Sequence, residues 1–441
     1  MTLRNPMRGL AAATTTMALA ATVSPALAAD TATDTAAGTN VRVALHATTG
    51  EQAPTKSYAN GSAPVATAGG RYVVFSTDSP LVPKDTNGLS DVYLRDTLEN
   101  RTVLISQSYA GRVGNGDSFE PTISANGMTV AFTTSATNLV TGAKDANGRV
   151  LDVVAVQVQD GVGSIVGIIS TRNDGTQAKG NSFFPVVSGD GLIVAFQTFG
   201  RLGPKDADRR EDVYVHSTKS GRTTQASLNA RDRDVKASVL VGDIDRWGRY
   251  VTFGNDHDIW VRDVGTGNTR RVWHEADDPA QPFPGGSAGR PVISGDGRFV
   301  AFTTMSTKIV AGERGHWSDV FRVNLATGKA RRVTVDAQGG QPDDHSFIPS
   351  LSFNGRYVGF SSFAGDLVEG DAPGSDAFVH DMRTRTTYLA SQGLDGPANG
   401  ESGRSAVAIS DNGRTLVYET YATNLVEGDT VDQAEVVAWR R

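Results

Sequence analysis

The sequence predicts an all-β fold, a seven-bladed β-propeller of four-stranded antiparallel blades closed by an N-terminal strand that completes the last blade. Three observations lead to this prediction. A glycine turn followed by an apolar run recurs seven times, with successive glycines 49 to 64 residues apart. Each repeat resolves into four short strands, and the two ends of the chain carry incomplete repeats that complement each other. Repeats of this length built from short strands are typical of propellers and solenoids.

The centre of each repeat is a turn glycine and the five mostly apolar residues after it. Glycine suits this turn because it adopts positive φ without strain. The run that follows is apolar on both faces, which indicates a strand with another sheet stacked on each side. The seven copies span residues 70–75, 127–132, 191–196, 248–253, 297–302, 355–360 and 413–418.

The next strand of each repeat begins with an acidic residue. A catalytic acid is rarely needed seven times, so we expect these side chains to be structural and to cap backbone amides where the strand starts. A second turn and an outer strand complete the unit. The acids are Asp91, Asp152, Asp212, Asp258, Asp319, Asp376 and Glu435.

The two ends of the chain favour a closed ring over a solenoid. The last repeat stops after its third strand, residues 435–439, and lacks an outer strand. The first extended segment, residues 41–45, precedes the first complete repeat and is free to supply it. Radial closure of this kind leaves no bare sheet edge, whereas a solenoid needs caps at both ends.

Residues 1–28 have the order of a secretory signal peptide: Arg4 and Arg8, a short apolar stretch, then small residues. We expect cleavage near Ala28, a flexible leader over residues 29–40 and the propeller over residues 41–441. The apolar stretch is short for a membrane span, and no second candidate follows it. These features predict a secreted, extracytoplasmic protein with no transmembrane segment after the signal peptide is removed.

The composition excludes several classes of function. The chain has 42 Lys plus Arg, 48 Asp plus Glu, a formal charge of −6 and no cysteine. A chain with a net negative charge lacks the basic surface that attracts nucleic acids, so no nucleic-acid partner is expected. The absence of cysteine excludes disulfides, thiolate metal sites and a cysteine nucleophile. We expect a monomer that requires no cofactor.

The repeat, written as S-x-D-G-R-[YF]-V-A-F…N-L-V-x-G-D-x-x-G-x-x-D-V-[YF]-V-x-D, resembles the TolB-like (WD-type) propeller repeat of secreted and periplasmic bacterial proteins. The resemblance covers roughly residues 41–441. It implies the propeller fold and an extracytoplasmic place in a bacterium, and it says little about function. TolB itself adds an N-terminal α/β domain and has six blades, neither of which is predicted here.

Two loops that join second to third strands suit Ca²⁺, which prefers oxygen ligands. Their candidate ligands are Asp85, Asn87 and Asp91 in the first repeat, and Asp145, Asn147 and Asp152 in the second. The alternative interpretation is an Asx turn, in which the same side chains bond nearby backbone amides. Ca²⁺ is therefore a possible ligand and not a required one.

Four histidines are less evenly spread than the repeated acids, and we expect them on one sector of the loop-bearing face. With two neighbouring carboxylates they form a candidate ligand-binding set, because imidazole and carboxylate can bind a transition metal or move protons. The alternative is a solvated polar rim whose histidines never meet. The set is His257, His274, His316, His345, Asp256 and Asp344.

Two functions are compatible with these observations. The first is a binding scaffold whose loop face holds an extracytoplasmic protein or a cell-wall glycan; it assigns no catalytic residue. The second is a metal-assisted polysaccharide lyase or hydrolase that uses the histidines of the fourth to sixth repeats. The repeats without a unique catalytic constellation favour the first.

Overall fold

Every regular element in the described part of the chain is a β-strand, and the strands form seven four-stranded antiparallel sheets. The computed structural model describes residues 38–50, 65–140, 145–159, 162–206, 208–255, 257–274, 290–312, 317–371, 373–429 and 433–441. The predicted signal peptide, its cleavage site and most of the predicted leader lie outside these residues. No helix in the described ranges is long and apolar enough to cross a bilayer.

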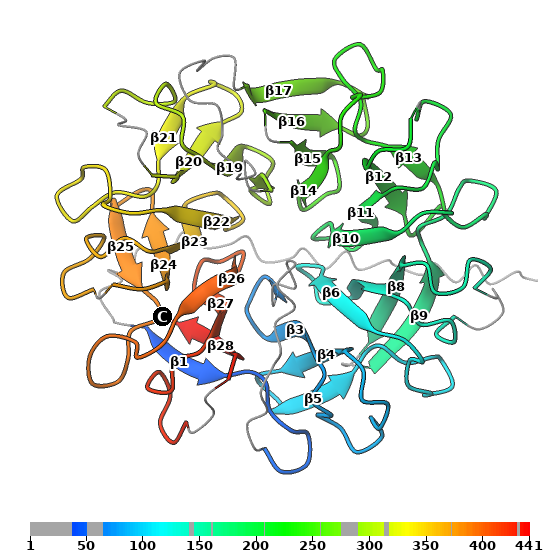
Figure 1. The fold of residues 1–441 in the computed structure, drawn as a ribbon, viewed down its shortest axis with the longest axis horizontal. Coiled ribbons are helices and arrows are strands. Elements are labelled where there is room, and N and C mark those ends of the chain that lie inside the picture. The colour runs from blue at the N-terminus through cyan, green and yellow to red at the C-terminus, as the bar shows by residue number, and fades with distance from the viewer. Residues whose placement is uncertain are drawn as a thin grey trace, which may run out of the picture. The chain divides into compact units, whose positions relative to one another are not determined.

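The sheets are the seven predicted blades, and Figure 1 shows them arranged around a central axis. In blades one to six the strands run in sequence from the innermost to the outermost. Blade one has β2 (Val65–Ala66), β3 (Tyr72–Thr77), β4 (Asp91–Asp96) and β5 (Arg101–Leu104); blade two has β6 (Ser118–Ile123), β7 (Thr129–Thr134), β8 (Asp152–Gln159) and β9 (Val162–Ile168). Blade three has β10 (Ser182–Val187), β11 (Ile193–Thr198), β12 (Asp212–Ser217) and β13 (Thr223–Gln225); blade four has β14 (Leu240–Ile244), β15 (Tyr250–Gly254), β16 (Asp258–Asp263) and β17 (Thr269–His274).

The remaining blades follow the same order, except that the last one takes its outer strand from the start of the chain. Blade five has β18 (Val292–Ile293), β19 (Phe299–Thr304), β20 (Asp319–Asn324) and β21 (Ala330–Arg332); blade six has β22 (Ser346–Leu351), β23 (Tyr357–Ser362), β24 (Asp376–Asp381) and β25 (Thr386–Leu389). Blade seven has β26 (Ser402–Ile409), β27 (Thr415–Thr420), β28 (Glu435–Arg440) and β1 (Thr39–Arg42).

The predicted apolar runs form the second strand of every blade and the centre of the core. The phenylalanine that ends each run from blade one to blade six is fully buried, because sheets pack against both faces of the strand. Side chains of neighbouring blades share the same hydrophobic clusters; Leu94 of blade one packs in one cluster with Val130 of blade two. The blades therefore stabilise one another, as expected for a propeller.

The ring closes as predicted, with β1 paired antiparallel to β28 (Figure 1, blue beside red). The strand begins at Thr39, two residues earlier than the sequence pattern indicated. The reason is Asn40, whose side chain donates to the carbonyl of Ala390 (3.0 Å) and accepts from the Tyr418 hydroxyl (2.8 Å). These hydrogen bonds connect Asn40, near the start of β1, to blades six and seven.

A second closure surrounds the axis at the seven turns between first and second strands. Each turn donates a backbone N–H to a carbonyl of the next turn, and the series returns to its start. We call this ring of turns the collar. Its bonds are Ala68 to Ala125, Asn126 to Gly189, Asp190 to Arg246, Arg246 to Gly295, Asp296 to Phe353, Phe353 to Asp411 and Asn412 to Ala68.

The close packing of the collar explains the turn glycines. Gly413 has φ of 70°, and a Cβ on it would lie 2.0 Å from a ring carbon of Tyr357 in blade six. The position therefore excludes other residues both by backbone conformation and by space.

The repeated acid at the start of the third strand is structural, but it does not cap backbone amides as expected. In five blades it accepts a hydrogen bond from a Ser or Thr hydroxyl just after the outer strand, and that hydroxyl accepts the N–H of the residue that follows the acid. In blade six, for example, Ser391 Oγ lies 2.6 Å from Asp376 and 3.0 Å from the N of Ala377. The carboxylate orients the hydroxyl, and the hydroxyl satisfies the amide. The five pairs are Asp91–Ser106, Asp152–Ser170, Asp212–Ser227, Asp319–Thr334 and Asp376–Ser391.

Candidate functional site

The two faces of the ring differ in their connections. The loop face carries the loops from second to third strands and those from an outer strand to the next blade. The turn face carries the collar and the turns from third to outer strands. Loops on a rigid scaffold are where binding residues concentrate, so the loop face and the axis are the regions to compare with the sequence predictions.

The innermost strands surround a cavity of about 600 Å³ at the axis, and every blade contributes to its lining. Figure 1 shows β6, β10, β14, β22 and β26 around this axis. The lining mixes apolar side chains with a few charged ones. The charged residues are Glu120, Asp243, Arg246, Arg290 and Asp411.

Three of the innermost strands carry the same bulge, within the sequence Ser-Phe-x-Pro. The pairing with the second strand shifts at x and the proline in β6, β10 and β22. The residues at x are Glu120, Phe184 and Ile348, with φ of 54°, 53° and 52°. Left-handed backbone costs a non-glycine residue about 1–3 kcal/mol and often marks a functional site. All three residues line the cavity.

Glu120 holds the next blade in this strained form. One of its carboxylate oxygens, Oε2, accepts from the N–H of Phe184 (2.8 Å) and from the Thr133 hydroxyl (2.7 Å). Burial raises the pKa of Glu120, while these two donors and the charge of Arg290 lower it. The bulges of blades two and three are therefore joined through one buried carboxylate.

Arg290 reaches the same place from blade five. Its guanidinium carbon lies 3.3 Å from the centroid of the Phe184 ring, a stacked cation–π contact. Burial lowers the pKa of Arg290 to about 10, against the charges of Glu120 and Glu211. Within the described part of the chain its guanidinium forms no hydrogen bond.

The charged groups nearer the collar are already satisfied. Arg246 of blade four and Asp411 of blade seven form an ion pair of 2.7 Å. Asp243 accepts the backbone N–H groups of Ile244 (2.8 Å) and Ile293 (3.2 Å), and burial raises its pKa to about 6. Arg290 is thus the cavity's cation without a close anionic partner among the described residues.

Among the described members of the predicted histidine set, His257 and His274 are neighbours in blade four, and His345 and Asp344 lie elsewhere. His274 Nδ1 lies 2.8 Å from the carboxylate of Asp258 and 3.3 Å from the carbonyl of His257. His274 thus takes the place of the Ser or Thr hydroxyl that contacts the repeated acid in five other blades. His345 lies just before β22 of blade six, and its Nδ1 accepts the N–H of Ser318 of blade five (3.0 Å). Asp344 accepts the N–H of His345 (2.7 Å) through Oδ1. His316 and Asp256 lie outside the described residues.

The two predicted calcium loops have the hydrogen bonds of the Asx-turn alternative. Asn87 donates its amide to Asp91 (2.7 Å), and its carbonyl oxygen accepts the N–H of Leu89 (2.8 Å). Asp85 accepts the hydroxyl of Tyr93.

The blade-two loop is built in the same way. Asp145 accepts the N–H of Asn147 (3.1 Å), Asn147 donates to a backbone carbonyl (2.9 Å), and Asp152 accepts from Ser170. Ca²⁺ at either loop stays a prediction.

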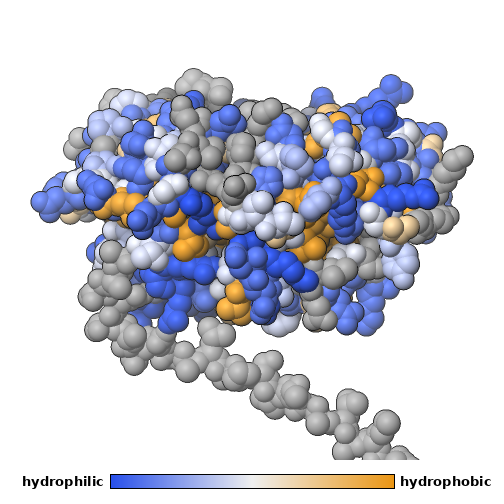
Figure 2. Space-filling view, turned by 90° about the horizontal axis from the view of Figure 1, so that it is seen from below, coloured by the Kyte–Doolittle hydropathy of each residue, from blue (hydrophilic) through white to orange (hydrophobic). Residues whose placement is uncertain are grey.

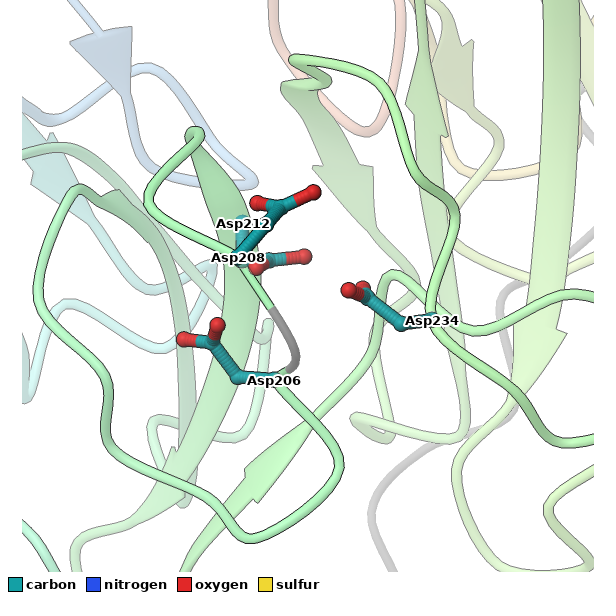
Figure 3. A group of neighbouring side chains, drawn as sticks. All are labelled: Asp206, Asp208, Asp212 and Asp234. Atoms are coloured by element: carbon teal, nitrogen blue, oxygen red, sulfur yellow. The ribbon is translucent and has the colours of Figure 1, made fainter.

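The blade-three copy of this loop has a carboxylate at each of the three candidate ligand positions. Asp206, Asp208 and Asp212 occupy the positions of Asp85, Asn87 and Asp91, and Asp234 approaches from the loop after β13. One ligand oxygen of each of the four lies within 4.8 Å of the others, and no other group of three or more His, Asp or Glu side chains in the described residues is this close. Figure 3 shows the four carboxylates pointing toward one another from two facing segments.

Burial makes this acidic cluster electrostatically unfavourable when fully ionised. Burial, together with the charges of Asp234 and Asp206, raises the pKa of Asp212 to about 7, against hydrogen bonds from Ser227 and Gln225 that lower it. Burial also raises the pKa of Asp206. Such a cluster can keep a proton at neutral pH or hold a hard divalent cation such as Ca²⁺.

Sequence reasoning overlooked both the cavity and the acidic cluster. The Asp-x-Asp-x-x-x-Asp spacing of residues 206–212 was available as a signal, because it aligns with the two predicted calcium loops of the first and second repeats. Asp234 and Arg290 had no such signal, since only folding brings them to their partners.

No protein-family model matches the chain, and no curated protein sequence matches it. Solved structures match it at low identity. An oligogalacturonate lyase from Vibrio parahaemolyticus is 12% identical with a TM-score of 0.49, over 92% of this chain and 98% of that one. The propeller domain of the Trilobed protease from Pyrococcus furiosus is 12% identical with a TM-score of 0.50, over 86% and 92%. A protein assigned as TolB from Agrobacterium tumefaciens is 15% identical with a TM-score of 0.39, over 77% and 94%.

These comparisons concern the fold. The Pyrococcus furiosus domain is described as having an open velcro topology. In contrast, the present chain closes its ring with a strand from one end paired to a strand from the other.

Proposed function

We propose that this chain is a secreted, TolB-like binding protein whose loop face holds an extracytoplasmic protein or glycan. The distribution of exposed aromatic side chains carries the proposal. Of the five most exposed in the described residues, four lie on loops of the loop face, and one, Trp247, lies on the turn face. The four are Tyr109, Phe199, Trp317 and Tyr421, which are 77%, 47%, 37% and 45% exposed.

Aromatic rings suit this role because they offer a large contact area that loses little conformational entropy on binding. Two of the four are held in place by neighbours. The Trp317 ring packs edge-on against His345 at 5.0 Å, and the Phe199 ring lies 5.8 Å from Phe183 at the start of β10. On the side of the ring seen in Figure 2, polar residues predominate and apolar ones form separate patches.

The repeated acids support a binding role over a catalytic one. Five of them bond a Ser or Thr hydroxyl in the same way, so their recurrence has a structural cause. Of the predicted histidine set, His257 and His274 lie in blade four and His345 lies at the boundary of blades five and six. No catalytic residue is proposed.

Substitution of two of the loop-face aromatics should weaken binding. The chain without residues 1–28 is applied to glycan arrays and used in pull-downs from bacterial envelope lysates, with and without Ca²⁺. We expect the double variant Trp317→Ala, Phe199→Ala to lower the affinity of the wild-type ligand by at least about tenfold, as loss of exposed aromatic anchors does.

Trp247→Ala is the control, because it removes an exposed aromatic ring, 63% accessible, from the turn face. Its binding should equal that of the wild type. A ligand that depends on Trp247 and tolerates the double variant would contradict the proposal, and so would the absence of any ligand.

A further inference from the structure

We propose that the axial cavity binds a small organic carboxylate and that Arg290 holds its carboxylate group. This goes beyond the macromolecular partner proposed above and does not depend on it. The cavity lies inside the ring of innermost strands, whereas that partner would contact the loops.

The state of Arg290 is the first argument. Stacking on Phe184 at 3.3 Å occupies one face of the guanidinium and leaves its N–H donors, which lie in the plane of the group, for other partners. Those donors form a rigid fork that matches the two oxygens of a carboxylate. Since they form no hydrogen bond within the described residues, the fork is available to a ligand in the cavity.

The construction of the cavity is the second argument. Its volume of about 600 Å³ falls in the usual range for small-molecule sites of about 300–1,000 Å³. Phe184, which supports Arg290, has left-handed backbone, and Glu120 of the neighbouring blade fixes it through its N–H. A strained residue locked by a buried carboxylate is a costly way to line an empty channel, and a binding site accounts for that cost.

The charges of the cavity select the kind of anion. Besides Arg290, its lining contains Arg246, which is already paired with Asp411, and the two acids Glu120 and Asp243. A dianion such as phosphate would bring two negative charges close to these acids, and Arg290 alone would compensate them. A carboxylate brings only one negative charge, which Arg290 can balance. Phe184, which contacts Arg290, and Ile348 elsewhere in the lining offer apolar surface in the cavity, so the ligand should carry an aromatic or aliphatic body.

Three probes of similar shape test this assignment: benzoate, its neutral counterpart benzamide, and phenyl phosphate. Each is titrated into the chain without residues 1–28, with binding followed by ligand-observed NMR and by the ¹⁵N shift of the Arg290 Nε–H. We expect benzoate to bind at millimolar concentration or below and to shift the Arg290 signal. Benzamide and phenyl phosphate should bind at least about tenfold more weakly.

Two variants locate the interaction. Arg290→Met should lower benzoate affinity at least about tenfold, since it removes a charge-assisted bidentate contact. Arg298→Met should leave benzoate affinity unchanged; Arg298 also stacks on an aromatic ring, Phe299 at 5.8 Å, but lies at the turn face with its side chain 64% exposed.

The proposal is overturned if benzoate does not bind, if benzamide binds equally well, if phenyl phosphate binds more tightly, or if Arg290→Met binds benzoate like the wild type. Should Arg290→Met not fold, the wild-type comparison of benzoate with benzamide and the Arg290 Nε–H shift decide the question.

Discussion

A chain that begins at His46 is expected to lose its cooperative unfolding transition, whereas a chain that begins at Gly38 should melt like the full-length protein. The first lacks β1 and the residues directly after it. Without them β28 has an unpaired edge, and the ring is open at the contact between blades seven and one. An open edge of this kind also promotes association with other chains.

The expected effect is large because the lost segment is part of the core. Val43 and Ala44 are fully buried beside Val73 of blade one and Val436 of blade seven. Burial of a valine side chain contributes about 1.5–3 kcal/mol. The deletion also removes the pairing with β28 and uncovers apolar residues behind it. A total of roughly 5 kcal/mol or more is comparable to the whole stability of many proteins.

Thermal melts by circular dichroism and size-exclusion chromatography compare the two truncated chains. A synthetic peptide of residues 38–47, added to the shorter chain, should restore the transition by strand addition. If the chain from His46 melts at the temperature of the chain from Gly38, β1 is dispensable and the closure has no energetic importance.

The fold was predictable because its signals are local and repeated. The turn glycine, the apolar run and the acid that begins the third strand each recur, so the number of blades and their strand order follow from the sequence. Closure was predictable for another reason: the two incomplete ends match only if they pair. What the sequence could not give was the start of β1 at Thr39, since Asn40 acquires its partners only in the folded ring.

The candidate sites were less predictable because they join residues from different blades. Arg290 precedes β18 yet stacks on Phe184 in blade three, and no spacing in the sequence relates the two. The Ser-Phe-x-Pro bulges have a visible motif, but their left-handed backbone does not follow from residue type; isoleucine is a poor choice for φ of 52°. The repeated acid shows the same limit. Its structural role was evident from recurrence, and its hydroxyl partner was not.

Raising the pH from 5 to 8 is expected to destabilise the protein. Burial raises the pKa of five aspartates well above the usual value for Asp. The unfolded chain releases these protons near pH 4, whereas the folded chain retains them to higher pH, so folded protein binds more protons between the two values. These aspartates make stability fall as pH rises through this window. Buried His380, whose pKa burial lowers to about 4, opposes part of the fall below about pH 6.5. The groups are Asp91 and Asp212, with pKa of about 7, and Asp152, Asp243 and Asp376, with pKa of about 6.

The size of the effect follows from the shifts. Each unit of pKa difference corresponds to about 1.4 kcal/mol. Only the part of each shift above pH 5 acts in this range, so the free energy of unfolding should fall by at least about 2 kcal/mol and the melting temperature by several degrees. Thermal melts at pH 5 and pH 8, at constant ionic strength, measure the change in melting temperature.

Asp212→Asn separates the acidic cluster from the other groups. It removes one titrating charge while its amide oxygen can still accept from Ser227, so it should be more stable than the wild type at pH 8 and depend less on pH. Asp96→Asn is the contrasting control, because the Arg71 guanidinium and backbone N–H groups lower the pKa of Asp96. That variant should lose stability at both pH values. A wild type that is more stable at pH 8 than at pH 5 would contradict the prediction.

The same melts at pH 8 decide how the acidic cluster is neutralised. If it keeps a proton, Ca²⁺ and a chelator should leave the melting temperature unchanged, and the fall with pH should be complete. If it holds Ca²⁺, millimolar Ca²⁺ should raise the melting temperature of the wild type at pH 8 and cancel the part of the destabilisation that comes from the cluster, because a ligand of the folded state alone stabilises it. Asp208→Asn should reduce that increase, since it removes the charge of one of the four carboxylates.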